Sequence, residues 1–140
     1  MEWKEMPELK GLIKQLKKAF PEKLSHIDSE RILFANFSRK KSKNAAKVGG
    51  IPKRFSIFLK DFVYFIEVHK ESWEEFDEGM KFYVVFHELM HIPAKGFDIE
   101  ERQFGKVLDH DLKDFKVLIK EYGVDQENTE KLLRHIKSKN

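Results

Sequence analysis

The first clear pattern of apolar and polar positions predicts an amphipathic helix over residues 7–20. Its apolar residues recur at intervals of three and four, so they share one face of an α-helix. They are Leu9, Leu12, Ile13, Leu16 and Phe20. Pro7 stands near the first turn and Pro21 follows the last, as is common at the two ends of a helix. We expect this helix to pack its apolar face on the core.

The middle of the chain carries the pattern of β-strands. Residues 31–37 form a short apolar run that is typical of a buried strand. Residues 48–59 begin irregularly with glycine and proline and then alternate between apolar and polar positions. A strongly β-forming stretch follows at residues 62–68, after a plausible tight turn at residues 60–61. We therefore expect a hairpin between residues 48 and 68.

A helix over residues 78–92 is predicted to be apolar on most of its circumference. One stripe at helical spacing consists of Met80, Val84, His87 and His91, and other sides carry Phe82, Phe86 and Leu89. Such a helix is expected to be buried, and its two histidines then need partners. Before it, Ser72 and Glu75 resemble a capping box for a short helical turn, and Asp77 with Gly79 indicates a break.

Two more helices are predicted near the C-terminus, after a polar segment without clear periodicity at residues 94–108. The first covers residues 112–122 and stops at Gly123. The second covers residues 126–137, with Asp125 as its N-cap. We expect this helix to bury Leu132, Leu133 and Ile136. These elements predict an α+β fold in which helices pack on a small antiparallel sheet of about three strands.

Composition fits one domain over residues 1–140. The chain is 41% hydrophobic and contains 13 Phe and 2 Trp, which supports a sizeable core. It has no Cys, which excludes disulfides and thiolate ligands. The start has no apolar signal region and no segment approaches eighteen apolar residues, so we expect a cytoplasmic protein without a membrane contact.

Basic and acidic residues nearly balance, at 27 against 24, so no overall field demands a nucleic-acid partner. One local run differs, because residues 39–47 carry five positive charges and no acidic residue. The charges belong to Arg39, Lys40, Lys41, Lys43 and Lys47. A run of this kind is usually a solvated loop, and a contact with nucleic acid is the less common alternative.

The sequence His87-Glu88-Leu89-Met90-His91 has the residue types and spacing of a zinc-hydrolase centre. Residues four apart share one face of a helix, so both imidazoles can reach one metal ion while Glu88 stands beside the open position. Two neutral imidazoles keep Zn²⁺ a strong Lewis acid, able to lower the pKa of a bound water to about 7. Glu88 is then the candidate general base, and afterwards the general acid for the leaving amine.

A catalytic zinc normally has three protein ligands, so one more donor is needed. The candidates after the motif are Asp98, Glu101, Asp109 and His110. We favour His110, because an imidazole suits zinc and a long loop allows the chain to return to the site. Asp109 or Asp111 could orient the His110 ring. The other histidines have no partner at ligand spacing and are predicted at the surface or at strand ends; they are His26, His69 and His135.

Three blocks of the sequence resemble the zincin metallopeptidases, and more narrowly a group of metallopeptidases found in archaea and phages. The blocks are residues 64–68, residues 87–93 with the sequence HELMHIP, and residues 110–115 with the sequence HDLKDF. The resemblance covers about residues 30–120. It implies a minimal zincin core with zinc bound by His87, His91 and His110, and with Glu88 as the catalytic acid and base.

The resemblance does not extend to every zincin group. Metzincins would place Gly at position 94 and His at position 97, whereas this chain has Ala94 and Phe97. In the gluzincin pattern the third ligand is a glutamate on the following helix, for which Glu101 is the candidate.

Two functions from different classes fit these observations. The first is a zinc-dependent peptidase that binds an extended peptide or protein segment along an exposed strand. Its oxyanion could be stabilised by Tyr64, Tyr83 or Arg54. The second is a non-catalytic, zinc-stabilised module that contacts nucleic acid or an acidic partner through residues 39–47.

Overall fold

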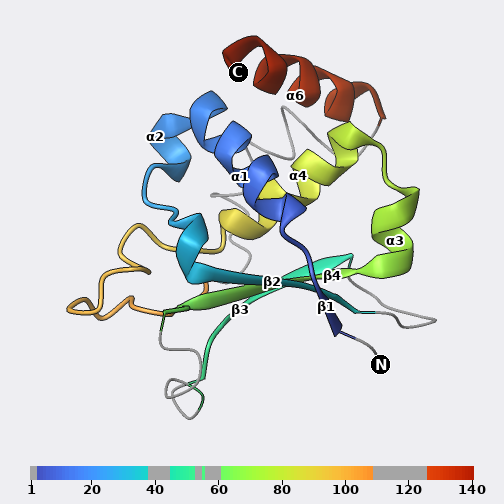
Figure 1. Ribbon diagram of the computed structural model, residues 1–140. Coiled ribbons are helices and arrows are strands. Elements are labelled where there is room, and N and C mark those ends of the chain that lie inside the picture. Colours follow the sequence, from blue (N-terminus) through green and yellow to red (C-terminus); the bar gives the residue numbers. More distant parts are fainter. Residues whose placement is uncertain (1–2, 38–44, 53–54, 56–60, 109–125) are drawn as a thin grey trace.

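The computed structural model describes residues 3–37, 45–52, 55, 61–108 and 126–140. Helices cover one face of a sheet, as Figure 1 shows. The elements are β1 (Trp3–Glu5), α1 (Glu8–Ala19), α2 (Pro21–Leu24), the 3-10 turn η1 (Ser29–Arg31), β2 (Ile32–Phe37), β3 (Ala46–Gly50), β4 (Tyr64–His69), α3 (Lys70–Glu75), α4 (Glu78–Leu89) and α6 (Gln126–Lys139). The α+β class predicted from the sequence is confirmed.

The sheet is mixed and has four strands in the order β1-β2-β4-β3. Strand β4 pairs antiparallel with β3 but parallel with β2, so the expectation of about three purely antiparallel strands was wrong in this detail. The physical reason is that β4 inserts between β2 and β3. An apolar run fits either pairing direction, and only the crossover of the chain decides between them. Strand β1 was missed because it has only three residues.

The hairpin expected between residues 48 and 68 is present as the pair β3 and β4, with Val48 opposite Ile66. Strand β3 ends at Gly50 instead of continuing to residue 59. Just beyond it, the carbonyl of Pro52 accepts a hydrogen bond from the amide of Phe55, which is a turn. Residues 53–54 and 56–60 lie outside the described residues, and they include the first residue of the tight turn expected at 60–61.

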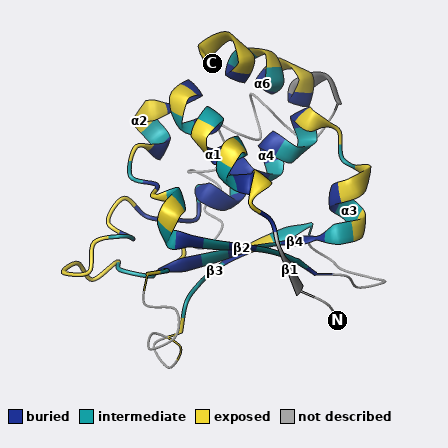
Figure 2. Ribbon diagram, in the orientation of Figure 1, coloured by how far each residue is buried: buried dark blue, intermediate teal, exposed yellow. Residues whose placement is uncertain are grey.

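The core lies between the sheet and the helices (Figure 2). Helix α1 buries the face that its apolar spacing predicts, and it contacts both α4 and α6. The rings of Phe20 and Phe86 meet edge to face, with centroids 4.5 Å apart. Pro21 does end α1, but it also opens the short helix α2, because proline suits a first helical turn. This packing holds α4 against the sheet.

Helix α4 begins where the sequence suggests, because the Asp77 carboxylate accepts a hydrogen bond of 2.8 Å from the amide of Met80. Gly79 belongs to the first turn of α4 and does not break it. A Cβ atom at this position would lie 2.6 Å from the carbonyl oxygen of Thr129, so glycine allows α4 and α6 to touch. The expected cap at Ser72 was wrong, since α3 starts at Lys70 and Ser72 lies inside it.

The last helix, α6, is two residues longer than expected and buries Leu132 and Ile136 completely, whereas Leu133 is half-buried. Its expected cap, Asp125, and the helix predicted at residues 112–122 lie outside the described residues. None of the helices that the structure describes is both long and apolar enough to cross a membrane.

Candidate metal centre

The end of α4 and the turn after it bring together the three polar residues of the HELMH motif. One possible ligand atom each of His87, Glu88 and His91 lies within 4.8 Å of the other two. The two imidazole rings stand nearly perpendicular, with centroids 5.2 Å apart. Glu88 and His91 are buried, whereas His87 is half-buried. A pair of imidazoles and a carboxylate at this distance is a suitable donor set for a divalent metal ion.

The orientation of His91 is fixed by the backbone of Leu108. Nδ1 of His91 lies 2.6 Å from the carbonyl oxygen of Leu108, and the amide of Leu108 donates in turn to the carbonyl of His91. Because a carbonyl oxygen can only accept, Nδ1 carries the proton of the neutral ring. Nε2 is then the nitrogen able to coordinate a metal, which is the arrangement typical of metal-binding histidines.

Glu88 connects the helix to the edge strand β3. Its Oε2 atom accepts a hydrogen bond of 3.1 Å from the amide of Val48. In an antiparallel pair, every second residue of a strand is hydrogen-bonded to the neighbouring strand. Residues 45 and 51 are bonded in this way to residues 69 and 63, so residue 48 falls on the other set and its amide points away from β4. Burial raises the pKa of Glu88 from 4.5 to about 7, although the Val48 amide works in the opposite direction. A carboxyl group with this pKa can both accept and release a proton near neutrality.

The stability of metal-stripped protein should therefore depend on the charge of Glu88. Between pH 4.5 and 7 the folded state holds a proton on Glu88 that the unfolded state releases, so stability falls as the pH rises through this window. We expect Glu88 to contribute a loss on the order of 3 kcal/mol to the free energy of unfolding from pH 4 to pH 8, seen as the difference between the natural protein and Glu88→Gln. Urea denaturation across this range measures it. In Glu88→Gln the free energy of unfolding should vary less with pH in this window. If the variant and the natural protein show the same pH dependence, the raised pKa of Glu88 is contradicted.

The segment after the motif, residues 92–108, is hydrogen-bonded to strand β4 and to the turn η1. The Tyr64 hydroxyl donates a hydrogen bond of 2.7 Å to the carbonyl of Lys106. Arg31 donates to the carbonyl of Phe97 over 2.8 Å. Gly96 passes directly against Tyr64, where an added Cβ would lie 2.3 Å from the hydroxyl oxygen. These contacts bring the chain back to His91 at Leu108.

The predicted third ligands have different outcomes. Asp98 and Glu101 are exposed and lie outside the ligand cluster formed by the described residues. The Asp98 carboxylate instead accepts a hydrogen bond from the amide of Glu100 in a turn. Asp109 and His110, together with Asp111, lie outside the described residues, so the preference for His110 stays a prediction.

The remaining histidines contact other groups. His69 ends β4 as expected, but it is buried, with Nδ1 2.7 Å from the Ser72 hydroxyl. His26 is half-buried, and its Nε2 lies 2.9 Å from the carbonyl of Ile92, next to the motif. His135 is half-buried against the ring of Phe20. Of these three histidines, His26 helps to hold the turn that follows α4, because it contacts the Ile92 carbonyl.

The other candidates from the sequence are partly placed. Tyr64 is fully buried and its hydroxyl is bonded to the Lys106 carbonyl, which makes it unsuited to stabilise an oxyanion. The Tyr83 ring lies one helical turn before His87, with centroids 6.3 Å apart. Arg54 lies outside the described residues, as do residues 39–44 of the basic run. Lys47 is exposed on β3, opposite Glu67.

Two partners of the centre could not be found from sequence. The Val48 amide and the Leu108 carbonyl are backbone groups. Every residue has the carbonyl and every residue except proline has the amide N–H. Their roles follow from where β3 and the segment before residue 109 lie in the fold. The side chains of the motif are the part that sequence can reveal.

Comparison with known proteins adds one finding. A protein-family model described as "Putative phage metallopeptidase" matches residues 1–137. The match includes the sheet, α4 and the motif. No curated protein and no solved structure matches the chain.

Proposed function

Because the chain belongs to the putative phage metallopeptidase family, we propose that it hydrolyses peptide bonds with a zinc ion bound at the end of α4. In this proposal His87, His91 and His110 hold the metal and Glu88 is the general base and acid. The observation that carries it is the cluster itself, with ligand atoms of His87, Glu88 and His91 mutually within 4.8 Å.

The donor set suits zinc. Two imidazoles are available, the chain has no cysteine, and the Leu108 carbonyl selects the His91 tautomer whose Nε2 can coordinate. When bound, zinc would supply a Lewis acid that polarises the peptide carbonyl and makes water more acidic. The half-buried His87 keeps one side of the cluster near solvent, as a centre that must admit substrate requires.

Glu88 moves the proton in this proposal. Its carboxylate takes a proton from the attacking water and gives it to the nitrogen of the leaving amine. Burial raises the pKa of Glu88 in the metal-free protein, and the positive charge of a bound zinc ion would lower it again, which favours the carboxylate form that accepts a proton from water. The Val48 amide holds Oε2, so the orientation of the carboxylate is restrained on one side.

His110 is the third ligand in this proposal, and chain connectivity supports it. Leu108 is bonded to His91 in both directions. Two residues of chain span at most about 7 Å, so His110 starts within reach of the cluster. Asp98 and Glu101 offer no comparable support, since both are exposed on turns.

The substrate in this proposal is an extended peptide that adds to strand β3. This strand is at the edge of the described sheet. Its outward-facing Val48 amide already binds Glu88, so an added peptide would pair with the outward-facing backbone groups of residues 46 and 50 on either side. An added strand would thus pass beside the catalytic carboxylate.

Hydrolysis of an unstructured protein such as casein tests the proposed function. Protein stripped of metal by a chelator should be inactive, and one equivalent of zinc should restore cleavage. New N-termini measured by mass spectrometry would report the reaction. If zinc binds with one-to-one stoichiometry and no peptide bond is cut in any peptide pool, the assignment as a peptidase is wrong.

Tyr64→Phe tests whether the segment 92–108 positions His91. The substitution removes one hydroxyl and its hydrogen bond to the Lys106 carbonyl, two residues before Leu108. We expect zinc affinity to fall about tenfold, within the range found when an outer partner of a metal-bound histidine is lost. Competition with a chromophoric chelator measures this.

Tyr83→Phe is the matched control, because it removes the hydroxyl of another buried tyrosine that has no described hydrogen bond to this segment. Its zinc affinity should equal that of the natural protein. Equal affinities in both variants would show that Tyr64 does not act on the centre.

A further inference from the structure

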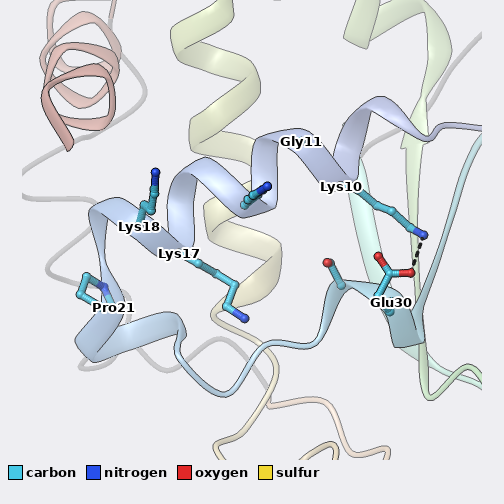
Figure 3. A pocket seen from close by; sticks show the side chains of 8 residues that line it. Lys10, Gly11, Lys17, Lys18, Pro21 and Glu30 are labelled. Atoms are coloured by element: carbon cyan, nitrogen blue, oxygen red, sulfur yellow. Dashed lines mark hydrogen bonds and ion pairs between the residues drawn. The ribbon is translucent and has the colours of Figure 1, made fainter. Parts of the chain in front are cut away.

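A groove lined by lysines runs between α1 and the turn η1 (Figure 3), and none of its lining residues belongs to the metal cluster. Its volume is about 670 Å³, within the range of ligand-binding clefts. The lining residues are Lys10, Gly11, Lys14, Lys17, Lys18, Pro21, Ser29 and Glu30. None of the residues in this lining is aromatic, and its apolar surface comes from Pro21 and the aliphatic stems of the lysines. The groove therefore offers positive charge above the apolar surface of the lysine stems and Pro21.

The charge of the groove is concentrated toward one end. Glu30 is the single acidic residue of the described lining, and it pairs with Lys10 over 3.2 Å. Lys17 and Lys18 lie toward the other end, near Pro21, as Figure 3 shows. Lys17 donates to the carbonyl of Ile27, which holds its ammonium group beside the groove without neutralising it. An anion would therefore bind toward Lys14, Lys17 and Lys18.

Gly11 lines the groove, and the packing of the described residues does not explain why this position is a glycine. It occupies an exposed position inside α1, where glycine destabilises a helix by about 0.5–1 kcal/mol relative to alanine. A Cβ atom built at this position would have no atom within 4 Å. Nothing described inside the molecule therefore requires glycine here. The missing side chain leaves the helix backbone open to close approach from outside.

The positive surface continues beyond the groove. A second hollow of about 470 Å³ shares Lys18 and Pro21 with it and extends to the end of α6. This hollow adds Lys23 and Lys139, with Glu22 as its acidic residue. The two hollows form a strip longer than one small anion needs, which favours a polymer of negative charges.

We propose that this strip, defined by Lys14, Lys17, Lys18, Lys23 and Lys139, binds the phosphate backbone of a nucleic-acid duplex without sequence preference. Lysines are point charges that contact phosphates and carry little base specificity. An acidic protein is a poorer match, because protein partners are usually anchored on exposed aromatic and large apolar side chains, and Phe20, the one phenylalanine that lines the described strip, is buried. The proposal is independent of the metal and of peptide hydrolysis.

Fluorescence anisotropy with a labelled 20-base-pair DNA duplex of arbitrary sequence, measured on the full chain at several salt concentrations, tests the proposal. The double variant Lys14→Gln with Lys18→Gln should weaken binding on the order of tenfold and reduce the salt dependence by about two phosphate contacts. Lys95→Gln with Lys106→Gln removes the same charge from the exposed segment 92–108 and should leave both quantities nearly unchanged.

Gly11→Gln separates binding from folding. Glutamine favours a helix and meets no atom here, so the melting temperature should rise by about 2–4 °C while DNA affinity falls several-fold. Wild-type affinity in both Gly11→Gln and the double lysine variant would overturn the proposal. Tighter binding of labelled polyglutamate than of the duplex, dependent on Lys14 and Lys18, would overturn it too, because the occupant would then be an acidic polypeptide.

Discussion

Glu88→Gln is expected to abolish peptide hydrolysis while leaving zinc bound. The amide keeps the shape of the side chain and an oxygen that can accept from the Val48 amide, but it cannot take a proton from water. Loss of a general base typically costs about 10²–10⁴-fold in rate. Steady-state cleavage of a fluorogenic peptide, with zinc content measured on the same samples, gives both quantities.

The matched control is Glu74→Gln, the same chemical change at an exposed carboxylate of α3 outside the ligand cluster. It should retain both zinc and activity. Normal activity in zinc-loaded Glu88→Gln would refute the role of Glu88, whatever the behaviour of the control. Loss of zinc from Glu88→Gln would instead indicate that this carboxylate is itself a ligand.

His110→Ala is expected to release zinc. Removing one of three protein ligands should cost more than the 10–100-fold that loss of an outer partner costs. The affinity is measured by chelator competition, and bound metal by elemental analysis after dialysis. Circular dichroism of the same samples distinguishes loss of the metal from loss of the fold, because an unfolded variant would lose the signal of the described helices.

Asp98→Ala and Glu101→Gln complete this comparison, because they change the other candidates that follow the motif. Both should bind zinc normally. If Glu101→Gln loses zinc while His110→Ala keeps it, the centre is of the gluzincin kind and the third ligand was assigned wrongly. If X-ray absorption shows four protein ligands, the metal is structural and the non-catalytic module becomes the better explanation.

Sequence was informative where periodicity and chemistry coincide. The spacing of Leu9, Ile13 and Leu16 predicted the buried face of α1, and the motif predicted that His87 and His91 would face one point. In both cases the geometry of a single helix decides which side chains meet, so nearby residues contain the whole answer.

The pairing of the strands could not be predicted in the same way. Strand β4 is parallel to β2 and antiparallel to β3. The alternation of side chains between the two faces of the sheet is the same in both pairings, so it does not indicate the direction of either neighbour. The orientation of His91 depends on Leu108, seventeen residues away, through a backbone carbonyl that has no signature in the sequence. Contacts between distant segments that are made by backbone groups cannot be predicted from a single sequence, because nearly every residue has the same backbone groups.

The glycine at position 79 has a consequence for any attempt to shorten this protein. Helices α4 and α6 meet there with no space for even a methyl group, since a Cβ would lie 2.6 Å from the Thr129 carbonyl oxygen. The C-terminal helix is thus one wall of the scaffold behind the HELMH residues. A protein shortened to end at residue 108 would retain the side chains of His87, Glu88 and His91. The surface of α4 that α6 covers would nevertheless be exposed to water.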